Sequence, residues 1–431
     1  MKSIRKAVIV DGVRTPFLDS GGAYSQLMTY ELGGKAIAGL VNKTGIDASR
    51  VNMVTMGTVL HEIETSNVAR ESMLSAGLPA TIPAYTTSMA GLSASVGFAN
   101  LCDMIALGRI DVGIAAGVES FSDIPIRYSQ KIRRAAMKVR QDSSAKNILK
   151  NLVSLRPADL KPEMPTGTDF TTRKTMGVCA EQMVQKFKVS REDCDAFTVR
   201  SHQLAIEALK QGHFDGTIIP VQVPGVKQPI TQDNTPRKDS NIQKLSTMRT
   251  IFRKDGVITA AGSSRFTDGS AALLVTSQQA AAEMGLQPLA EVVDYQLAAV
   301  KSLEEEMLLG PAVSIPALLA RNNLSMTDID VWELHEAFAA QVLVNIACMQ
   351  RSEFAGEYFN GEVPGELPIE KLNTWGGSLS LGNPFAATGI RLLTTAARRL
   401  QVENKRYAVV SSCAGGGLGA AILLENKGAL N

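Results

Sequence analysis

The stretch AYTTSMAGLSA, residues 84–94, decides the fold because it opens a helix built mainly from small side chains. Ala, Gly and Ser recur through residues 91–107, and the run from Asp111 to Gly117 then predicts a buried strand. The whole chain is rich in glycine (36 residues) and poor in aromatic side chains (5%). This composition suits close packing of helices against a sheet.

The same pattern returns near the end of the chain. A similar helix over residues 386–400 leads through a polar turn to a strand over residues 407–412, which Cys413-Ala414-Gly415 follow. This repetition favours two similar layered α/β halves that face each other, with the active site between them. The alternative is a single large doubly wound domain.

A change of composition after about residue 121 marks an insertion. Between Arg127 and Arg156 lie seven basic side chains and one acidic side chain, Asp142. We predict an N-terminal half (1–121 plus 247–288), an inserted loop domain (122–246) and a C-terminal half (289–431). The remaining patterns predict strands over 7–10, 51–60, 257–259, 271–276 and 289–293, and helices over 30–46, 64–76, 176–188 and 190–211.

Bulk properties exclude several classes of protein. The net charge of +2 gives no basic field for nucleic acid. The five cysteines form neither a CxxC pair nor a Cys/His cluster, so we expect no metal and no disulfide framework. The first residues run directly into a predicted strand and no apolar run approaches the roughly 20 residues of a membrane span. We therefore expect a cytoplasmic protein.

Several short motifs point to one family of enzymes. His335-Glu336-Ala337-Phe338, Cys413-Ala414-Gly415-Gly416-Gly417 and Gly262-Ser263-Ser264 are the most informative. Together with RTPF (14–17), TSNVAR (65–70), TDGS (267–270) and WGGS (375–378), they resemble the thiolase family from about residue 5 to about residue 425. Within that family the chain is most similar to the thiolase subunit of trifunctional fatty-acid oxidation complexes.

The resemblance implies a five-layer α/β/α/β/α fold with an inserted loop domain. It also implies an acyltransferase of fatty acid metabolism that makes or breaks carbon–carbon bonds in acyl-CoA or 3-oxoacyl-CoA thioesters. We expect no cofactor beyond the CoA thioester itself. The expected assembly is a homodimer or larger oligomer, with a hydratase/dehydrogenase chain or an active thiolase chain as a further partner.

The resemblance assigns roles to individual residues. His335 corresponds to a residue of the first oxyanion hole, Cys413 to the acid/base cysteine, and the N–H of Gly415 to a donor of the second oxyanion hole. Ser264 corresponds to a serine that touches the pantetheine arm of CoA. Phe338 and Gly416, from the same motifs, and Gly382, from Gly382-Asn383-Pro384 at the family's Gly-His-Pro motif, complete the expected substrate-binding set.

Two catalytic groups of the family are missing. Gly91 stands where the family has its nucleophilic cysteine, and Asn383 stands where the family has the histidine that activates it. A third change puts Gly262 where many members have Asn. Cys102 lies 11 residues after Gly91, about three helical turns away, and cannot replace the nucleophile locally. We therefore treat Gly91 and Asn383 as degenerate catalytic positions.

Each of these residues also has an ordinary structural interpretation. Cys413 could be a small buried hydrophobe and His335 a satisfied core histidine. Asn383 could form a polar wall of the pocket or only a turn. The replacement nucleophiles to consider are Ser88, Ser93 and Ser95, although capping and packing roles are favoured because no base is evident. The basic stretch 127–156 is either a solvated face or a contact for CoA phosphates, anionic lipid or a partner subunit.

Two hypotheses for function follow. The first is an acyl-CoA-handling enzyme in which Cys413 moves a proton and His335 polarises the thioester or ketone oxygen. Such an enzyme would form no covalent acyl-enzyme and would perform Claisen-type, aldol-type or proton-transfer chemistry. The second is a catalytically inactive CoA-binding or scaffolding subunit of a thiolase or fatty-acid oxidation complex.

Overall fold

One mixed sheet forms the centre of the protein. The structure, a computed structural model, describes residues 4–165 and 167–429, so the outermost residues of the two predicted halves lie outside it. The strand order is β4-β3-β5-β6-β1-β7-β10-β9-β8, and β2 pairs with β6. The two parts of the sheet meet where β1 pairs with β7 over residues 7–9. The strands are β1 (Ala7–Arg14), β2 (Leu18–Asp19), β3 (Met53–Gly57), β4 (Ala84–Thr87), β5 (Val112–Glu119), β6 (Thr267–Ser277), β7 (Ala290–Ala299), β8 (Val331–Leu334), β9 (Tyr407–Ala414) and β10 (Leu418–Glu425).

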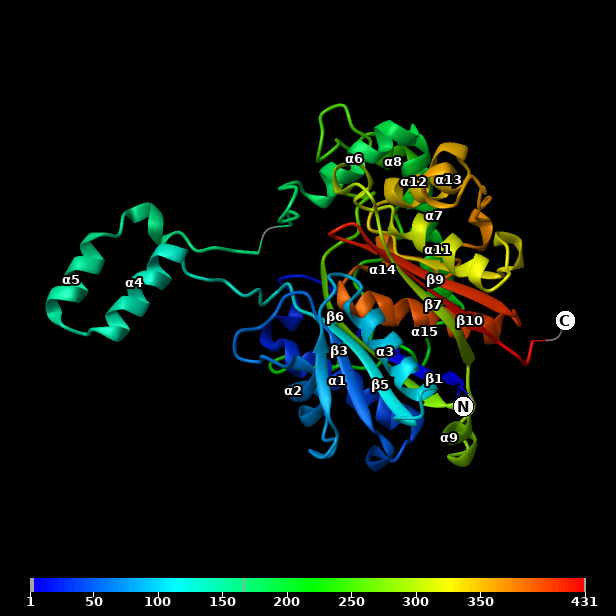
Figure 1. Ribbon diagram of the computed structural model, residues 1–431, viewed down its shortest axis with the longest axis horizontal. Coiled ribbons are helices and arrows are strands. Elements are labelled where there is room, and N and C mark those ends of the chain that lie inside the picture. Colours follow the sequence, from blue (N-terminus) through cyan, green and yellow to red (C-terminus); the bar gives the residue numbers. More distant parts are fainter. Residues whose placement is uncertain (1–3, 166, 430–431) are drawn as a thin grey trace.

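Helices cover both parts of the sheet and fill the space between them (Figure 1). Helices α1 and α2 pack on the N-terminal strands, α3 and α15 lie between the two parts, and α11 with α12 covers the C-terminal strands. The helices are α1 (Thr29–Thr44), α2 (Val68–Ser75), α3 (Ser93–Ala106), α4 (Gln130–Gln141), α5 (Ala145–Val153), α6 (Met176–Phe187), α7 (Arg191–Lys210), α8 (Ile242–Ser246), α9 (Gln278–Glu283), α10 (Leu303–Glu306), α11 (Gly310–Arg321), α12 (Ala339–Met349), α13 (Ser352–Tyr358), α14 (Ser378–Leu381) and α15 (Ala386–Val402).

Three large apolar clusters correspond to the three spaces between these layers. On β6, Leu274 belongs to the outer N-terminal cluster, while its neighbours Leu273 and Val275 belong to the central one. Successive side chains of a strand point to opposite faces, so β6 is buried on both faces. This explains the uninterrupted apolar run in its sequence. The third cluster lies between the C-terminal strands and α6, α11 and α12.

Close contact between the two repeated units explains the small side chains at the place where they meet. A Cβ on Gly389 of α15 would clash with Ser95 Oγ of α3, so a larger residue there would require this hydroxyl to move. A Cβ on Gly117 of β5 would lie 2.6 Å from the carbonyl oxygen of Ala386. Helices α3 and α15 therefore meet at the centre of the molecule only because these positions are small.

The insertion consists of two structurally different pieces. Helices α6 and α7, which confirm the helices predicted over 176–188 and 190–211, pack on α12 and α14 of the C-terminal half. Helices α4 and α5 form a separate hairpin that projects from the body of the protein (Figure 1). We call α4 and α5 with their connecting turn the arm, residues 130–153.

The strand predicted over residues 257–259 is wrong. This segment has no ladder partner beyond an isolated bridge between Thr259 and Thr250. The carboxylate of Glu181 accepts hydrogen bonds from the backbone N–H groups of Val257 and Ile258 at 2.8–3.1 Å. A buried side chain of α6 thus satisfies the backbone groups that a neighbouring strand would otherwise have to bond.

Candidate active site

Gly91 lies in the tight turn that joins β4 to α3. Ser93 Oγ accepts a hydrogen bond from the N–H of Met89 at 2.8 Å and donates to the carbonyl oxygen of Ala90 at 2.6 Å. The strained residue of this turn is Ala90, whose φ is 48°. A Cβ on Gly91 would meet its nearest neighbours, Ala414 Cβ and the Cys413 carbonyl oxygen, at 3.9 Å. Position 91 therefore faces the Cys413–Ala414 strand end and has room for a side chain.

The hydroxyl of Ser93 is thus engaged in hydrogen bonds within the turn. The other two serines near Gly91 have different surroundings. Ser95 is buried against the position of Gly389. Ser88 is exposed, and its Oγ lies 3.2 Å from Nε2 of His61. A base near these serines could not be recognised from the sequence, because His61 precedes Ser88 by 27 residues along the chain.

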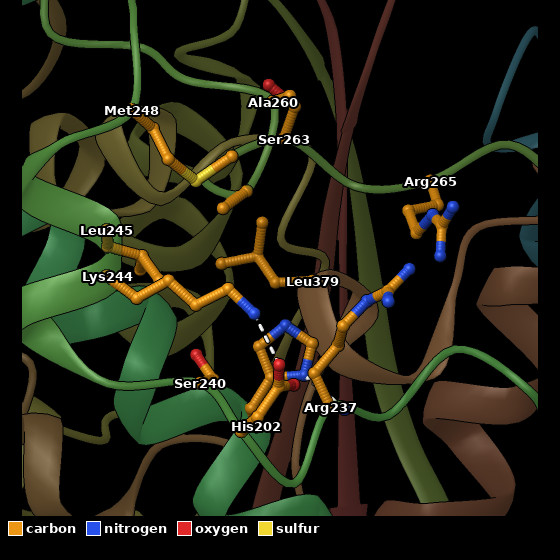
Figure 2. A pocket seen from close by; sticks show the side chains of 12 residues that line it. His202, Arg237, Ser240, Lys244, Leu245, Met248, Ala260, Ser263, Arg265 and Leu379 are labelled. Atoms are coloured by element: carbon orange, nitrogen blue, oxygen red, sulfur yellow. Dashed lines mark hydrogen bonds and ion pairs between the residues drawn. The ribbon is translucent and has the colours of Figure 1, made fainter.

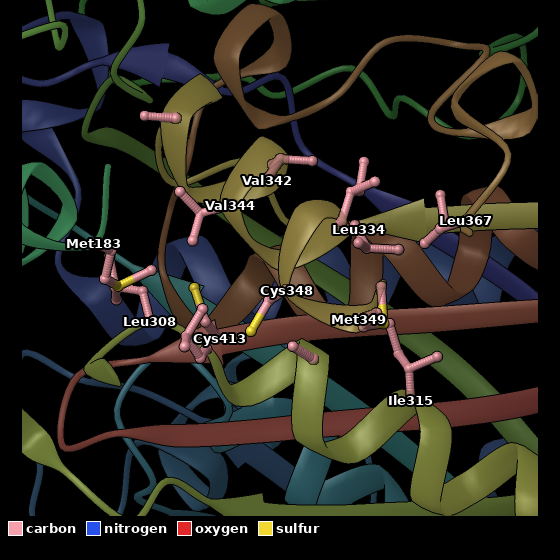
Figure 3. Close-up of a cluster of buried hydrophobic side chains, with 14 of the residues drawn as sticks. Met183, Leu308, Ile315, Leu334, Val342, Val344, Cys348, Met349, Leu367 and Cys413 are labelled. Atoms are coloured by element: carbon pink, nitrogen blue, oxygen red, sulfur yellow. The ribbon is translucent and has the colours of Figure 1, made fainter. Parts of the chain in front are cut away.

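Cys413 lies near the end of β9 and its side chain enters the C-terminal apolar core. It is 4% exposed and belongs to the cluster that also contains Leu308, Cys348 and Met183 (Figure 3). Burial raises the pKa of Cys413 to about 12. The thiol is therefore neutral near pH 7, and it is suited to donate a proton rather than to attack as a thiolate.

His335 follows β8 and is held by its backbone and by its ring. Its N–H donates to the carbonyl oxygen of Ser411 on β9 at 2.9 Å. Its Nδ1 lies 2.8 Å from Ser378 Oγ, which also accepts a hydrogen bond from Arg391 at 2.8 Å. Burial, assisted by the charge of Arg391, lowers the pKa of His335 to about 3. The imidazole is therefore neutral at physiological pH.

Asn383 brings an amide next to this imidazole. Its Nδ2 lies 3.4 Å from His335 Nε2 and donates to Ser264 Oγ at 3.2 Å. Its Oδ1 accepts a hydrogen bond from Thr388 Oγ1 at 2.9 Å. The preceding Gly382 has a φ of 87° and turns the chain into this position. Three of the residues predicted for the site, His335, Asn383 and Ser264, are thus in direct contact.

The segment before β6 runs alongside the motif His335-Glu336-Ala337-Phe338. The N–H of Ser264 donates to the carbonyl oxygen of Ala337 at 2.9 Å, and the N–H of Ala339 donates to that of Gly262 at 3.0 Å. Phe338 is mostly buried and packs edge-to-face on Phe252. These contacts fix Ser264 beside the Asn383 amide.

Gly415 and Gly416 lie in the turn between β9 and β10. Gly416 has a φ of 84°, so a left-handed backbone is built into this turn. A Cβ on Gly415 would lie 3.6 Å from the sulfur of Met176, at the first residue of α6. The turn that follows Cys413 thus touches the insertion.

A cavity of about 270 Å³ opens next to this cluster (Figure 2). Ser263, Arg265 and Leu379 are among the residues that line it and adjoin Ser264 and Ser378 in the chain. Its full lining is His202, Arg237, Asp239, Ser240, Lys244, Leu245, Met248, Ala260, Ala261, Ser263, Arg265 and Leu379. Most of this wall comes from the insertion and the segment that follows it.

Three cationic side chains, Arg237, Lys244 and Arg265, line the cavity. Lys244 pairs with Asp239, and Arg265 pairs with Asp19 at 2.9 Å. His202 Nδ1 accepts a hydrogen bond from the N–H of Arg237 at 3.1 Å, and burial lowers the pKa of His202 to about 4. Sequence reasoning missed these residues because it looked for cations in the stretch 127–156, which forms the arm instead. Only the short basic pair Arg237-Lys238 could have drawn attention to this region.

Comparisons with known proteins find related families and proteins over most of the chain. Residues 7–279 match the family described as "Thiolase, N-terminal domain", and residues 286–426 match "Thiolase, C-terminal domain". "Trifunctional enzyme subunit beta, mitochondrial" of Bos taurus is 40% identical over 98% of this chain and 89% of its own length. "Probable 3-ketoacyl-CoA thiolase" of Caenorhabditis elegans is 40% identical over 99% of this chain and 95% of its own length.

A solved structure gives the same result for the fold. The Bacillus anthracis acetyl-CoA acetyltransferase superposes with a TM-score of 0.84 and 30% identity, covering 99% of this chain and 100% of that one. The predicted fold class is therefore confirmed, and the two facing halves replace the alternative of one doubly wound domain.

Proposed function

The chain belongs to the thiolase family, and from this premise we propose that it binds acyl-CoA or 3-oxoacyl-CoA thioesters and acts on them without a covalent acyl-enzyme. The observation that carries this proposal is Gly91. Its position faces the Cys413 strand end and has room for a side chain, yet glycine offers no nucleophile. Ping-pong thiolysis therefore has no first step at this position.

Other cysteines do not supply the missing nucleophile. Cys102 lies on α3 inside the central apolar cluster, and burial raises the pKa of its thiol. Cys413 is likewise protonated near neutral pH. Neither is a thiolate that could attack a thioester carbonyl carbon.

The cavity would bind the CoA part of the ligand. Arg237, Lys244 and Arg265 suit the phosphates of CoA, since phosphate groups prefer arginine and lysine partners. The apolar side chains of Leu245, Met248 and Leu379 suit the uncharged remainder of the ligand. In this arrangement the pantetheine arm passes Ser264 and delivers its thioester to His335 and Asn383.

Two uncharged groups, the His335 imidazole and the Cys413 thiol, would then perform the chemistry. His335 would polarise the carbonyl oxygen, and the Cys413 thiol would give a proton to the α-carbon or to an oxygen of the ligand. In the Claisen-type direction, the sulfur of free CoA adds to the 3-oxo carbon, the bond between that carbon and the α-carbon breaks, and the α-carbon takes the Cys413 proton, which the CoA thiol replaces, so that two thioesters leave. In a proton transfer alone, the α-carbon or an oxygen gains the Cys413 proton and no carbon–carbon bond changes. Cys413 would regain its proton from the ligand or from water.

A catalytically silent CoA-binding subunit is the second candidate. The raised pKa of Cys413 favours it, because deprotonation of this thiol needs a base close by. Such a subunit would pair with an active thiolase chain or with a hydratase/dehydrogenase chain. Co-purification would then recover a stoichiometric partner, and the isolated chain would leave thioesters unchanged.

Product analysis tests the first candidate against the second. The purified chain is incubated with a panel of 3-oxoacyl-CoAs and free CoA, and all thioesters are identified by mass spectrometry. Products that are absent with Cys413→Ala support non-covalent catalysis. Unchanged thioesters together with measurable CoA binding support the silent subunit.

Intact-protein mass spectrometry checks the absence of an acyl-enzyme. We expect no mass increase after addition of acyl-CoA. Ser88→Ala and Cys413→Ala serve as matched variants because Ser88 has His61 beside it. An acyl adduct that disappears in either variant would refute the non-covalent proposal and identify the nucleophile.

A further inference from the structure

Gly91 is a glycine that neither its own backbone nor its neighbours require. Gly382 and Gly416 have φ values of 87° and 84°, a conformation that glycine adopts most readily. Gly117 and Gly389 are small because a Cβ at either position would clash with the helix that faces it. The φ of Gly91 lies outside the left-handed region, and a Cβ there would meet no atom closer than 3.9 Å apart from its neighbours in the chain. A group of methyl size therefore fits beside Gly91 without displacing an atom.

The surroundings of this space are mainly apolar. Beyond the chain neighbours, the two atoms within 4 Å of a Cβ at position 91 are Ala414 Cβ and the carbonyl oxygen of Cys413. Ala414 belongs to a small apolar cluster that consists of Leu92, Ala414 and Ala420, with Met89, Ala90, Leu297 and Leu418 packed against it. A water molecule needs two or more polar partners, so an apolar group of a ligand suits this space better than water. Gly91 is partly exposed, which leaves the space accessible to a ligand.

The space also adjoins the residue to which we assign the proton transfer. In the proposed function, the Cys413 thiol gives its proton to the α-carbon of a bound thioester or to an oxygen. The carbonyl oxygen of the same residue is one wall of the space beside Gly91. A carbon substituent lies about 1.5 Å from the carbon that carries it. A branch on the α-carbon therefore stays close to Cys413 and to position 91.

We propose that the space beside Gly91 binds a short alkyl branch on the α-carbon of an acyl-CoA or 3-oxoacyl-CoA thioester. Gly91 is then a position that determines specificity, and not only a degenerate catalytic one. A straight acyl chain leaves the space unfilled, whereas a methyl branch buries its surface against Ala414 and Leu92. The CoA part of this ligand rests on the proposed function, whereas the preference for a branch is a separate quantity.

Calorimetry measures this preference with two saturated ligands, butyryl-CoA and 2-methylbutyryl-CoA, which differ by one methyl group at the α-carbon. Neither has a 3-oxo group, so binding is measured without cleavage of a carbon–carbon bond. The two enantiomers of the branched ligand are measured separately, because a fixed acyl chain directs the methyl group toward position 91 in only one of them. Burial of one methyl group changes affinity by about fourfold, so we expect the wild type to bind the better enantiomer about fourfold more tightly than butyryl-CoA.

Gly91→Ala places a methyl group of the protein in the same space. It should weaken binding of the better enantiomer by about tenfold or more and change the affinity for butyryl-CoA by less than about twofold. The backbone at position 91 allows alanine, so the variant should fold. Gly356→Ala is the matched control, because Gly356 is exposed on α13 and a Cβ there would meet no atom within 4 Å. It should keep the wild-type preference.

The outcomes separate this proposal from the proposed function. Equal affinity of the wild type for branched and straight ligands would overturn the branch site while leaving CoA binding intact. A preference that survives in Gly91→Ala would also overturn it, because the methyl group would then bind elsewhere. Failure of the wild type to bind any of these thioesters would refute the proposed function itself. Ala414→Val adds methyl groups from the other side of the same space and should also remove the preference, so it decides the case if Gly91→Ala does not fold.

Discussion

At the scale of single residues, positions 91 and 383 of the proposed site carry neither a thiol nor an imidazole. Gly91 provides no nucleophile, but its surroundings leave room for one. Asn383 provides no base, yet its amide contacts both His335 and Ser264. On our proposal the site still binds a CoA thioester and acts on it, whereas the second candidate function has the site bind the ligand without chemistry. The two cases differ in what restoring the side chains would do.

Restoring both groups should restore covalent chemistry. We expect Gly91→Cys with Asn383→His to form an acyl adduct with 3-oxoacyl-CoA and to release a chain-shortened thioester when CoA is added. The reason is that a thiol at position 91 would meet its neighbours at ordinary distances and gain an imidazole to activate it. Intact-protein mass spectrometry measures the adduct.

Gly91→Ala with Asn383→His is the control, since it has the imidazole but no thiol. It should fold and remain unmodified. A folded Gly91→Cys/Asn383→His protein that binds CoA and forms no adduct would show that the pocket differs from an active thiolase in further ways.

The buried imidazole of His335 should make the fold sensitive to acid. Its pKa is about 3 in the folded chain, below the ordinary value of 6.5. Between these values the unfolded chain binds a proton that the folded chain excludes, so stability falls as the pH drops below about 6.5. The loss is up to about 1.4 kcal/mol per pH unit for one such group.

Urea unfolding at pH 7.5 and pH 5.0 measures this effect. His335→Gln should lose less free energy of unfolding than the wild type between these two pH values, by about 2 kcal/mol. The comparison of variant with wild type also removes the opposing contribution of Glu119 and Glu333, whose pKa values burial raises to about 7. His61→Gln removes an exposed imidazole and is the control. Equal losses in all three proteins would contradict the prediction.

At the scale of secondary-structure elements, the arm is the part of the chain that projects from the body of the protein. Its exposed apolar side chains include Leu149 (63%), Leu152 (59%) and Val153 (77%). Arg134, Lys138, Arg140, Lys146 and Lys150 form no salt bridge with any residue that the structure describes. No helix in residues 4–165 or 167–429 has the length and apolar character to cross a membrane. Short helices that combine cations with exposed apolar residues suit the surface of an anionic bilayer.

We therefore expect the arm to bind vesicles that contain anionic phospholipid. Leu149→Asp/Leu152→Asp and Lys146→Glu/Lys150→Glu should each reduce co-sedimentation with such vesicles, by about tenfold or more for the charge reversals. Binding should also weaken as salt is raised. These positions are exposed or partly exposed, so the fold should be unaffected. Equal binding to zwitterionic vesicles, or no binding by the wild type, would contradict this prediction.

Sequence patterns predicted most helices and strands of the body. They failed where a side chain, and not a neighbouring strand, accepts the backbone hydrogen bonds of a segment. Periodicity located α3, α15 and the strands beside them because helices and strands bury residues at different spacings. Residues 257–259 have a strand-like composition, but Glu181 bonds their backbone from a distant helix. The family motifs predicted His335, Cys413 and Ser264 as site residues. They include Ser378, in WGGS, without giving it a role there, and they do not include Arg391 or His61, because only folding brings these residues together.

At the scale of the whole molecule, the sheet has a free edge close to the site. Strand β4 pairs with β3 and with no other strand of the described chain. Its last residue, Thr87, is four positions before Gly91. An unprotected edge strand favours pairing with a second copy of the same chain around a twofold axis. The homodimer expected from the family would thus place two sites next to one interface.

Removal of a single backbone N–H donor on β4 tests this interface. In the parallel ladder, the N–H of Val54 donates to the carbonyl oxygen of Pro83, so alternation directs the N–H of Ala84 away from β3. Ala84→Pro removes that donor and keeps the bonds within the chain. We expect the wild type to sediment as a dimer and Ala84→Pro to raise the dissociation constant about tenfold or more, as measured by analytical ultracentrifugation. Ala80→Pro, in the loop before β4, is the control. A dimer that Ala84→Pro leaves unchanged would place the interface elsewhere, and the free edge of β4 would then need another partner.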